Sequence, residues 1–224
     1  MMKSWLVYLL ISQVTQNPLL GILAVALLWY GGGSWWFGRM PDLAGPFRRW
    51  KQEQRLRETL RMNPHDTVAR CDLAGLVAHK HPTEAKELLS EVLRRYPDNE
   101  LAHYWLGIAQ LQLGETDGGR ASIDEALRLR RELRWGEPAK TLGDHYLAQR
   151  RPAEALVAYR RAIAVHGSFA EAWYKAGVAA RATGDEAEAK GLFQRTLSST
   201  EGAPPYKRRQ DRLWRWRAWW ALRR

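Results

Sequence analysis

Histidine, cysteine and glycine-rich turns are the features of this 224-residue chain whose residue types could do chemistry. His79 and His81 lie two residues apart, a spacing that suits a metal, but no third ligand stands out near them, which favours a solvated turn. Cys71 is the single cysteine, so neither an internal disulfide nor a four-cysteine zinc site can form. We expect Cys71 to pack against neighbouring side chains.

No motif of the sequence matches a catalytic or cofactor-binding site. GGGS at 31–34 lies at the edge of an apolar segment and DGGR at 117–120 opens a predicted helix, so neither is a phosphate-binding loop. No arrangement of Ser, His and Asp, or of Cys and His, follows from spacing. We therefore predict a protein that is not an enzyme, with no catalytic residue, no cofactor and no metal site.

The net charge of +11 is confined to the two ends of the chain. Residues 1–62 carry 8 Lys and Arg against 3 Asp and Glu, residues 63–200 carry 19 against 19, and residues 201–224 carry 8 against 2. Nine of the 12 tryptophans lie in the same two end segments. Because basic and aromatic residues gather together at both ends, the two end segments are predicted to share one task.

The segment 18–37, PLLGILAVALLWYGGGSWWF, is about as long as the ~20 residues that a bilayer-spanning helix needs. No charged residue stands between Lys3 and Arg39. A cleaved signal peptide is the alternative, but bulky residues follow where a small-residue cleavage site is expected. We therefore predict a spanning helix over 18–37, and three of its aromatic side chains suit the headgroup boundary, namely Trp29, Trp35 and Trp36.

The segments around this helix predict its orientation. Residues 4–14 are apolar but too short to span a bilayer, so they indicate an interfacial helix, with a re-entrant hairpin as the alternative. They complete a membrane anchor at 1–38, which a linker at 39–47 joins to a leading basic helix at 48–65. Because the basic residues follow the span, we predict a single-pass protein of the bacterial inner membrane whose C-terminal part is cytoplasmic.

The middle of the chain repeats with a nearly fixed period. Small residues recur at Ala74, Gly107, Gly143 and Gly177, with spacings of 33, 36 and 34 residues. Each copy continues into a second segment with alanine and a bulky residue at fixed offsets. The longer spacing places two extra residues near 133–138. Such a pattern predicts pairs of helices that approach closely at the small residues and bury bulky side chains between pairs.

This pattern resembles the tetratricopeptide repeat over 66–200. The resemblance implies an α-solenoid of about four helix pairs. With the predicted N-terminal transmembrane helix and a basic, Trp- and Arg-rich C-terminal helix, this gives an all-α fold. In this family the first helices of the pairs line a concave groove that holds a partner protein. The chain is also similar to bacterial membrane-anchored repeat proteins.

The resemblance implies which side chains face the groove. Carried across copy by copy, the positions are aromatic, aliphatic or charged, which suits a partner peptide or helix. Packing within the array is the alternative account of the two tyrosines. The predicted groove residues are Leu101, Tyr104, Ile108, Leu111, Lys140, Asp144, Leu147, Tyr174, Val178 and Arg181.

The tail at 201–224 has three possible roles. A helix that caps the last repeat should show one apolar stripe, and a nucleic-acid site could use the same residue types. The favoured interpretation is contact with anionic lipid at the membrane interface, because the chain already has a predicted anchor. A cap and an interface can share one helix. The predicted interfacial residues are Arg212, Trp214, Arg215, Trp216, Arg217, Trp219 and Trp220.

Taken together, these features predict a membrane-anchored scaffold that binds protein partners through its groove. The first alternative is an integral accessory or assembly subunit of a larger membrane complex. The second is a membrane-tethered nucleic-acid binder that uses the basic ends. The expected partners are thus proteins, including subunits of a membrane complex, and anionic lipid; nucleic acid is the least favoured partner, and self-association stays open.

Overall fold

The computed structural model describes residues 10–13, 19–20, 22–23, 45–199 and 201–223. Every regular element in these residues is a helix, which confirms the all-α class. The chain divides into two compact units, Met1–Gln52 and Glu53–Arg224.

In the N-terminal unit, the predicted membrane anchor lies largely outside the described residues. That applies to most of the interfacial helix at 4–14 and of the spanning helix at 18–37, and to all three of its tryptophans, Trp29, Trp35 and Trp36. The described residues within the anchor are helical, namely 10–13, 19–20 and 22–23. No helix in the described part of the chain is both long enough and apolar enough to cross a bilayer.

Helix α3, Gly45–Met62, leads into the second unit. It begins inside the predicted linker at 39–47, so the predicted start of the basic helix at residue 48 was three residues too late. In the second unit, Leu56 and Leu60 of α3 pack against the core. The Arg57 guanidinium donates a hydrogen bond of 2.6 Å to Glu84 Oε1 of the following repeat, which adds a polar contact to this apolar one.

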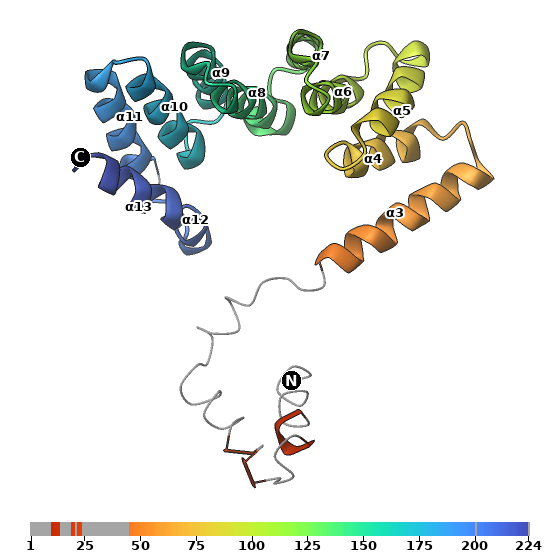
Figure 1. Ribbon diagram of the computed structural model, residues 1–224, viewed down its shortest axis with the longest axis horizontal. Coiled ribbons are helices and arrows are strands. Elements are labelled where there is room, and N and C mark those ends of the chain that lie inside the picture. Colours follow the sequence, from red (N-terminus) through yellow and green to blue (C-terminus); the bar gives the residue numbers. More distant parts are fainter. Residues whose placement is uncertain (1–9, 14–18, 21, 24–44, 200, 224) are drawn as a thin grey trace. The chain divides into compact units, whose positions relative to one another are not determined.

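The predicted array at 66–200 is four antiparallel helix pairs (Figure 1). Their inner layer consists of the first helices, since α4 contacts α6 and α6 contacts α8. The pairs are α4 Thr67–Val77 with α5 Pro82–Arg95, α6 Glu100–Gln112 with α7 Thr116–Leu129, α8 Glu137–Ala148 with α9 Pro152–Val165, and α10 Ala170–Ala182 with α11 Glu186–Ser198.

Local sequence signals start these helices. The side chains of Asp66, Asn99 and Asp185 each accept a hydrogen bond from a backbone N–H in the first turn, which satisfies a donor that the helix itself leaves open. Prolines at the first helical position begin α5 and α9, where the missing N–H costs nothing. Where these helices begin is therefore favoured by local sequence, before the helices pack in pairs.

The recurring glycines allow the two helices of a pair to approach, as the sequence predicted. A Cβ atom added at Gly143 would lie 2.7 Å from the ring of Tyr159, and one at Gly177 would lie 2.6 Å from the ring of Phe193. Both rings are fully buried. The close approach thus creates the space that the bulky residue of the second helix fills.

The junction between the second and third pairs differs from the others. Seven residues, 130–136, separate α7 from α8, whereas four separate α5 from α6 and four separate α9 from α10. Their last four form the turn η1, Leu133–Gly136, where Arg134 and Trp135 have positive φ values of 46° and 53°. This turn packs against α9, and α7 touches α8 at few positions.

Two helices, α12 Pro205–Gln210 and α13 Arg212–Ala221, follow the last pair. Helix α13 packs against α10 and α11 (Figure 1). Its array-facing side contains Ala218, which is completely buried. With Trp214, Ala221 and Leu222, Ala218 forms one narrow apolar stripe at helical spacing, as expected of a capping helix.

Candidate partner-binding surfaces

A cavity of about 440 Å³ opens on the inner layer between α6 and α8, and we call it the inner cavity. Three predicted groove residues of the second pair form its apolar floor, Tyr104, Ile108 and Leu111, and all three are buried. Tyr104 is only 1% exposed, and burial raises the pKa of its hydroxyl to about 12. These residues therefore line the site mainly as parts of the core, with little surface of their own.

The rim of the inner cavity is polar. Gln112 and His79 are exposed at its edge, and His145 lies half-buried beside them. The His145 ring lies 3.0 Å from the Thr116 hydroxyl, measured from Nε2 to Oγ1, and burial together with Arg151 lowers the pKa of this histidine. His145 is therefore neutral at pH 7, so the rim at this point offers hydrogen bonding without a charge.

Four alternating charges continue the rim onto α10. Lys175 Nζ bonds Asp144 Oδ1 at 2.8 Å and Glu171 Oε1 at 2.6 Å, and Lys140 Nζ lies 3.2 Å from the same Glu171 oxygen. The Tyr159 hydroxyl donates to Asp144 at 2.7 Å. Burial opposes the charge of Lys140, but the two carboxylates outweigh it and the pKa of Lys140 is raised. The network is thus electrically self-compensated.

The structure brings only some of the predicted groove residues together. Lys140 and Asp144 line the inner cavity with the floor of the second pair. Leu101 and Leu147 are half-buried and pack against the core instead. Glu171 and Lys175 were missed, although pairs of opposite charge four residues apart on two successive first helices were a readable signal.

Two predicted groove residues of the fourth pair, Tyr174 and Arg181, contact the terminal helix α13 and line a cavity of about 390 Å³ together with it. The Tyr174 ring lies 5.7 Å from the Trp214 ring of α13, measured between centroids. Arg181 donates a hydrogen bond to the backbone carbonyl of Ala221, and Val178 packs against the same core cluster as the buried Ala218. Tyr174 and Arg181 therefore help to hold α13, in the place where a further repeat would otherwise dock.

The solvent-facing side of α13 carries large apolar residues among cations. We call it the aromatic face; its exposed members are Leu213, Trp216, Trp219 and Trp220, with Arg212, Arg217 and Arg223 beside them. The Arg223 guanidinium lies 3.4 Å from the centroid of the Trp219 ring. Of the predicted interfacial residues, Trp214 and Arg215 are half-buried, so only the other five remain on the exposed side of this helix.

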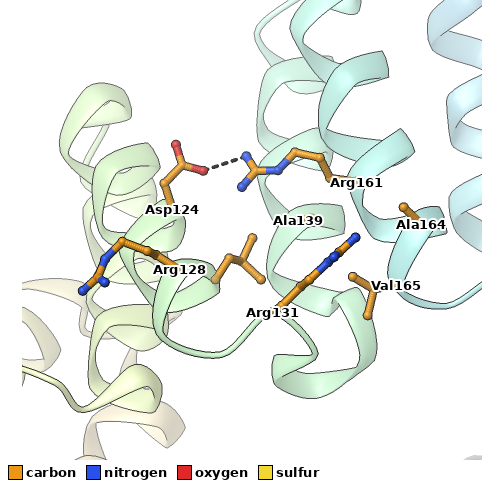
Figure 2. Close-up of a pocket in the computed structure, with 8 residues that line it drawn as sticks. Asp124, Arg128, Arg131, Ala139, Arg161, Ala164 and Val165 are labelled. Atoms are coloured by element: carbon orange, nitrogen blue, oxygen red, sulfur yellow. Dashed lines mark hydrogen bonds and ion pairs between the residues drawn. The ribbon is translucent and has the colours of Figure 1, made fainter.

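A second cavity, of about 370 Å³, lies on the outer side of the junction between the second and third helix pairs. We call it the outer cleft (Figure 2). Its apolar lining comes from three helices, through Leu127 of α7, Ala139 of α8, and Ala164 and Val165 of α9. Arginines and one aspartate surround this lining, namely Asp124, Arg128, Arg131 and Arg161. No pattern in the sequence indicated this site, because its parts lie up to 41 residues apart.

The residues first considered for chemistry lie in the core or at an exposed turn. Cys71 is buried, and burial raises the pKa of its thiol to about 11, so it packs in the core as expected. His79 and His81 are exposed at the turn before α5. Within the residues that the structure describes, no group of three or more His, Cys, Asp or Glu side chains is placed to hold a metal ion.

Stacked helix pairs with a lined inner layer and a terminal capping helix define an α-solenoid built for protein contacts. The family model of the tetratricopeptide repeat matches residues 75–133 and 140–204, more than half of the chain, and the chain belongs to this family. Proteins of this family are generally non-catalytic scaffolds for protein–protein interaction. No curated protein matches the sequence of the chain.

Solved structures share the fold at low identity. A crystal structure of MamA is 20% identical, with a TM-score of 0.59 and coverage of 73% of this chain and 97% of that chain. TTC0263, a thermophilic TPR protein in Thermus thermophilus, is 17% identical, with a TM-score of 0.56 and coverage of 77% and 93%. YrrB, a TPR protein with an unusual peptide-binding site, is 19% identical, with a TM-score of 0.53 and coverage of 66% and 76%.

Proposed function

We propose that this chain is a non-catalytic scaffold that holds a segment of a partner protein in the inner cavity. The observation that supports this role is the combination of an apolar floor, built on Tyr104 and Ile108, with a polar rim. Because Lys140, Asp144 and their neighbours on α10 already compensate one another, the cavity favours an apolar or uncharged segment over an acidic one. The peptide-binding site of YrrB shows that a related fold can serve such a role.

Site-specific photo-crosslinking in cells tests this proposal. A photoreactive residue in place of Gln112, at the rim of the inner cavity, should give discrete crosslinked products. The same residue in place of Ala153, exposed at the start of α9, serves as the matched control and should give none of them. Ala148→Trp, which adds bulk to an exposed rim position, should abolish the products because it fills the cavity.

The pattern of products also separates related roles. One stoichiometric product that copurifies in mild detergent would favour an integral accessory subunit of a membrane complex, whereas several salt-labile products would favour an adaptor. Equal products from Gln112 and Ala153, or products that survive Ala148→Trp, would contradict binding in the inner cavity.

We further propose that residues 1–38 anchor the chain in a bacterial inner membrane, with the repeats in the cytoplasm. The support is in the sequence, where an uncharged segment at 18–37 is followed by an excess of arginine and lysine. A reporter enzyme that is active only outside the cytoplasm, fused after Arg224, should remain silent. An active reporter would show that the C-terminal part lies outside the cytoplasm. Full-length protein in the soluble fraction would contradict the proposed membrane anchor.

We also propose that the aromatic face of α13 contacts anionic lipid. Indole rings suit the headgroup region, and the surrounding arginines attract negative headgroups by about 1 kcal/mol each near the surface. Trp216 and Trp220 lie edge to face with ring centroids 6.2 Å apart, so the two indoles form one exposed apolar cluster. The membrane anchor that we propose for residues 1–38 favours lipid over nucleic acid as the contact of this face.

A further inference from the structure

The outer cleft places a guanidinium group above an apolar floor. Figure 2 shows the Arg131 side chain reaching from the segment after α7 toward Val165 of α9, whereas Arg128 points away from the cleft. Arg128 forms an ion pair with Glu125, at 2.7 Å between Nη2 and Oε1. Among the residues that the structure describes, no carboxylate forms an ion pair with Arg131. Arg131 is therefore the charge in the cleft that the fold leaves uncompensated.

A strained turn, η1, separates two of the helices that line the cleft, α7 and α8. Arg134 and Trp135 both adopt the left-handed helical region, which costs an L-residue roughly 1–2 kcal/mol each. Gly136 then packs so tightly on α9 that an added Cβ would lie 2.8 Å from the carbonyl oxygen of Ala162. The turn thus occupies the position where the neighbouring helices would otherwise meet, as they do at the other junctions.

The fold itself shows what chemistry the cleft accepts. The Asp124 side chain, from α7, receives a hydrogen bond of 2.6 Å from Arg161 Nη1 of α9 at the mouth of the cleft (Figure 2). A side-chain carboxylate therefore fits between these two helices when it is paired with arginine. A second carboxylate can pair with Arg131 in the same way, since charge-assisted bonds of this kind are the strongest polar contacts available to a surface site.

We propose that the outer cleft binds an extended segment of a partner protein in which an acidic side chain, paired with Arg131, adjoins an aliphatic side chain that covers Leu127, Ala139, Ala164 and Val165. This surface is separate from the inner cavity, so the proposal extends the proposed function without depending on it. The cleft volume of about 370 Å³ suits two side chains of this size. A nucleic-acid backbone carries no aliphatic group for the floor, which favours a peptide.

Peptide selection on the purified full chain in detergent identifies the preferred sequence without a known partner. A random heptapeptide library displayed on phage is selected against the wild type, after removal of phages that bind Arg131→Gln. We expect enrichment of peptides with Asp or Glu next to Leu, Ile or Val. A fluorescein-labelled copy of the enriched peptide should bind about tenfold or more weakly to Arg131→Gln, and should lose binding to Ala164→Trp.

Matched variants make this result specific. Arg130→Gln removes the same charge from the adjacent residue, which pairs with Glu100 outside the cleft, and Ala153→Trp adds the same bulk elsewhere on α9. Both should bind the peptide like the wild type. Binding that survives Ala164→Trp and is lost in Ala148→Trp would place the peptide in the inner cavity, which supports the proposed function and overturns this proposal. Enriched peptides without an acidic residue, or no enrichment at all, would also overturn it.

Discussion

Arg181 of α10 donates a hydrogen bond of 2.9 Å to the backbone carbonyl oxygen of Ala221, at the end of α13. The same guanidinium lies 4.9 Å from the centroid of the Phe193 ring and pairs with Glu186. The Arg181 side chain of α10 therefore contacts both its partner helix α11 and the terminal helix α13. A residue predicted to bind a partner instead satisfies a carbonyl that the end of α13 leaves open, as a basic residue at a helix C-terminus commonly does.

The packing of α13 against α10 and α11 predicts that a charged residue at position 218 destabilises the protein. Ala218→Glu would place a charge in a fully buried position, so we expect a loss of about 3 kcal/mol in the free energy of unfolding of the region that α13 covers. Thermal denaturation and amide hydrogen exchange of α10 measure this loss. Trp216→Ala, at a 58% exposed position of the same helix, is the control and should change stability little. Unchanged protection in Ala218→Glu would show that α13 is not docked.

Two glycines in the fourth pair should respond to alanine in opposite directions. Gly177→Ala forces a Cβ to within 2.6 Å of the Phe193 ring, so we expect destabilisation by about 1–3 kcal/mol. Gly191 lies inside α11 with no atom near its would-be Cβ, and Gly191→Ala should stabilise the helix by about 0.5–1 kcal/mol. Chemical denaturation measures both changes. The same sign for the two variants would contradict the close approach of α10 and α11.

The Cys71 thiol should be inert in the folded protein. Burial raises its pKa to about 11, so at pH 8 the folded chain holds on the order of one thiolate per thousand molecules. Alkylation by iodoacetamide at pH 8 should therefore be at least about a hundredfold slower than in denaturant. The rate in the folded state should rise with pH as the pKa is approached. A fast reaction without denaturant would show that this part of the core opens readily.

The aromatic face predicts a specific pattern of lipid binding. A fragment from Gly45 to Arg224, which keeps α3 whole, should sediment with vesicles containing phosphatidylglycerol and should do so less as salt is added. Trp216→Ala combined with Trp220→Ala should weaken this binding, because burial of two indoles is lost. Trp135→Ala is the control, since Trp135 is 66% exposed at the turn η1. Equal binding by all variants would show that the arginines bind the vesicles without help from the indoles. Binding to RNA or DNA but not to vesicles would favour the nucleic-acid role.

The sequence alone determined the repeats of this protein. The small residues at Gly107, Gly143 and Gly177 act within one pair of helices, so their period is readable and the fold followed from it. The side chains of Asp66, Asn99 and Asp185, which cap helices in the structure, also act within one helix. The extra residues near 133–138 were also visible, as an irregular spacing. Local chemistry of this kind does not depend on which segments meet later.

Only the tertiary structure decided which surfaces are open. Tyr104 and Arg181 occupy groove positions by register, yet one is buried in the core and the other is engaged by α13. The outer cleft exists because η1 separates α7 from α8, and α13 docks through Ala218 because a small residue lets its backbone approach. Exposure depends on contacts between segments that are distant in sequence, and a periodic pattern specifies which residues share a face but not what finally covers that face.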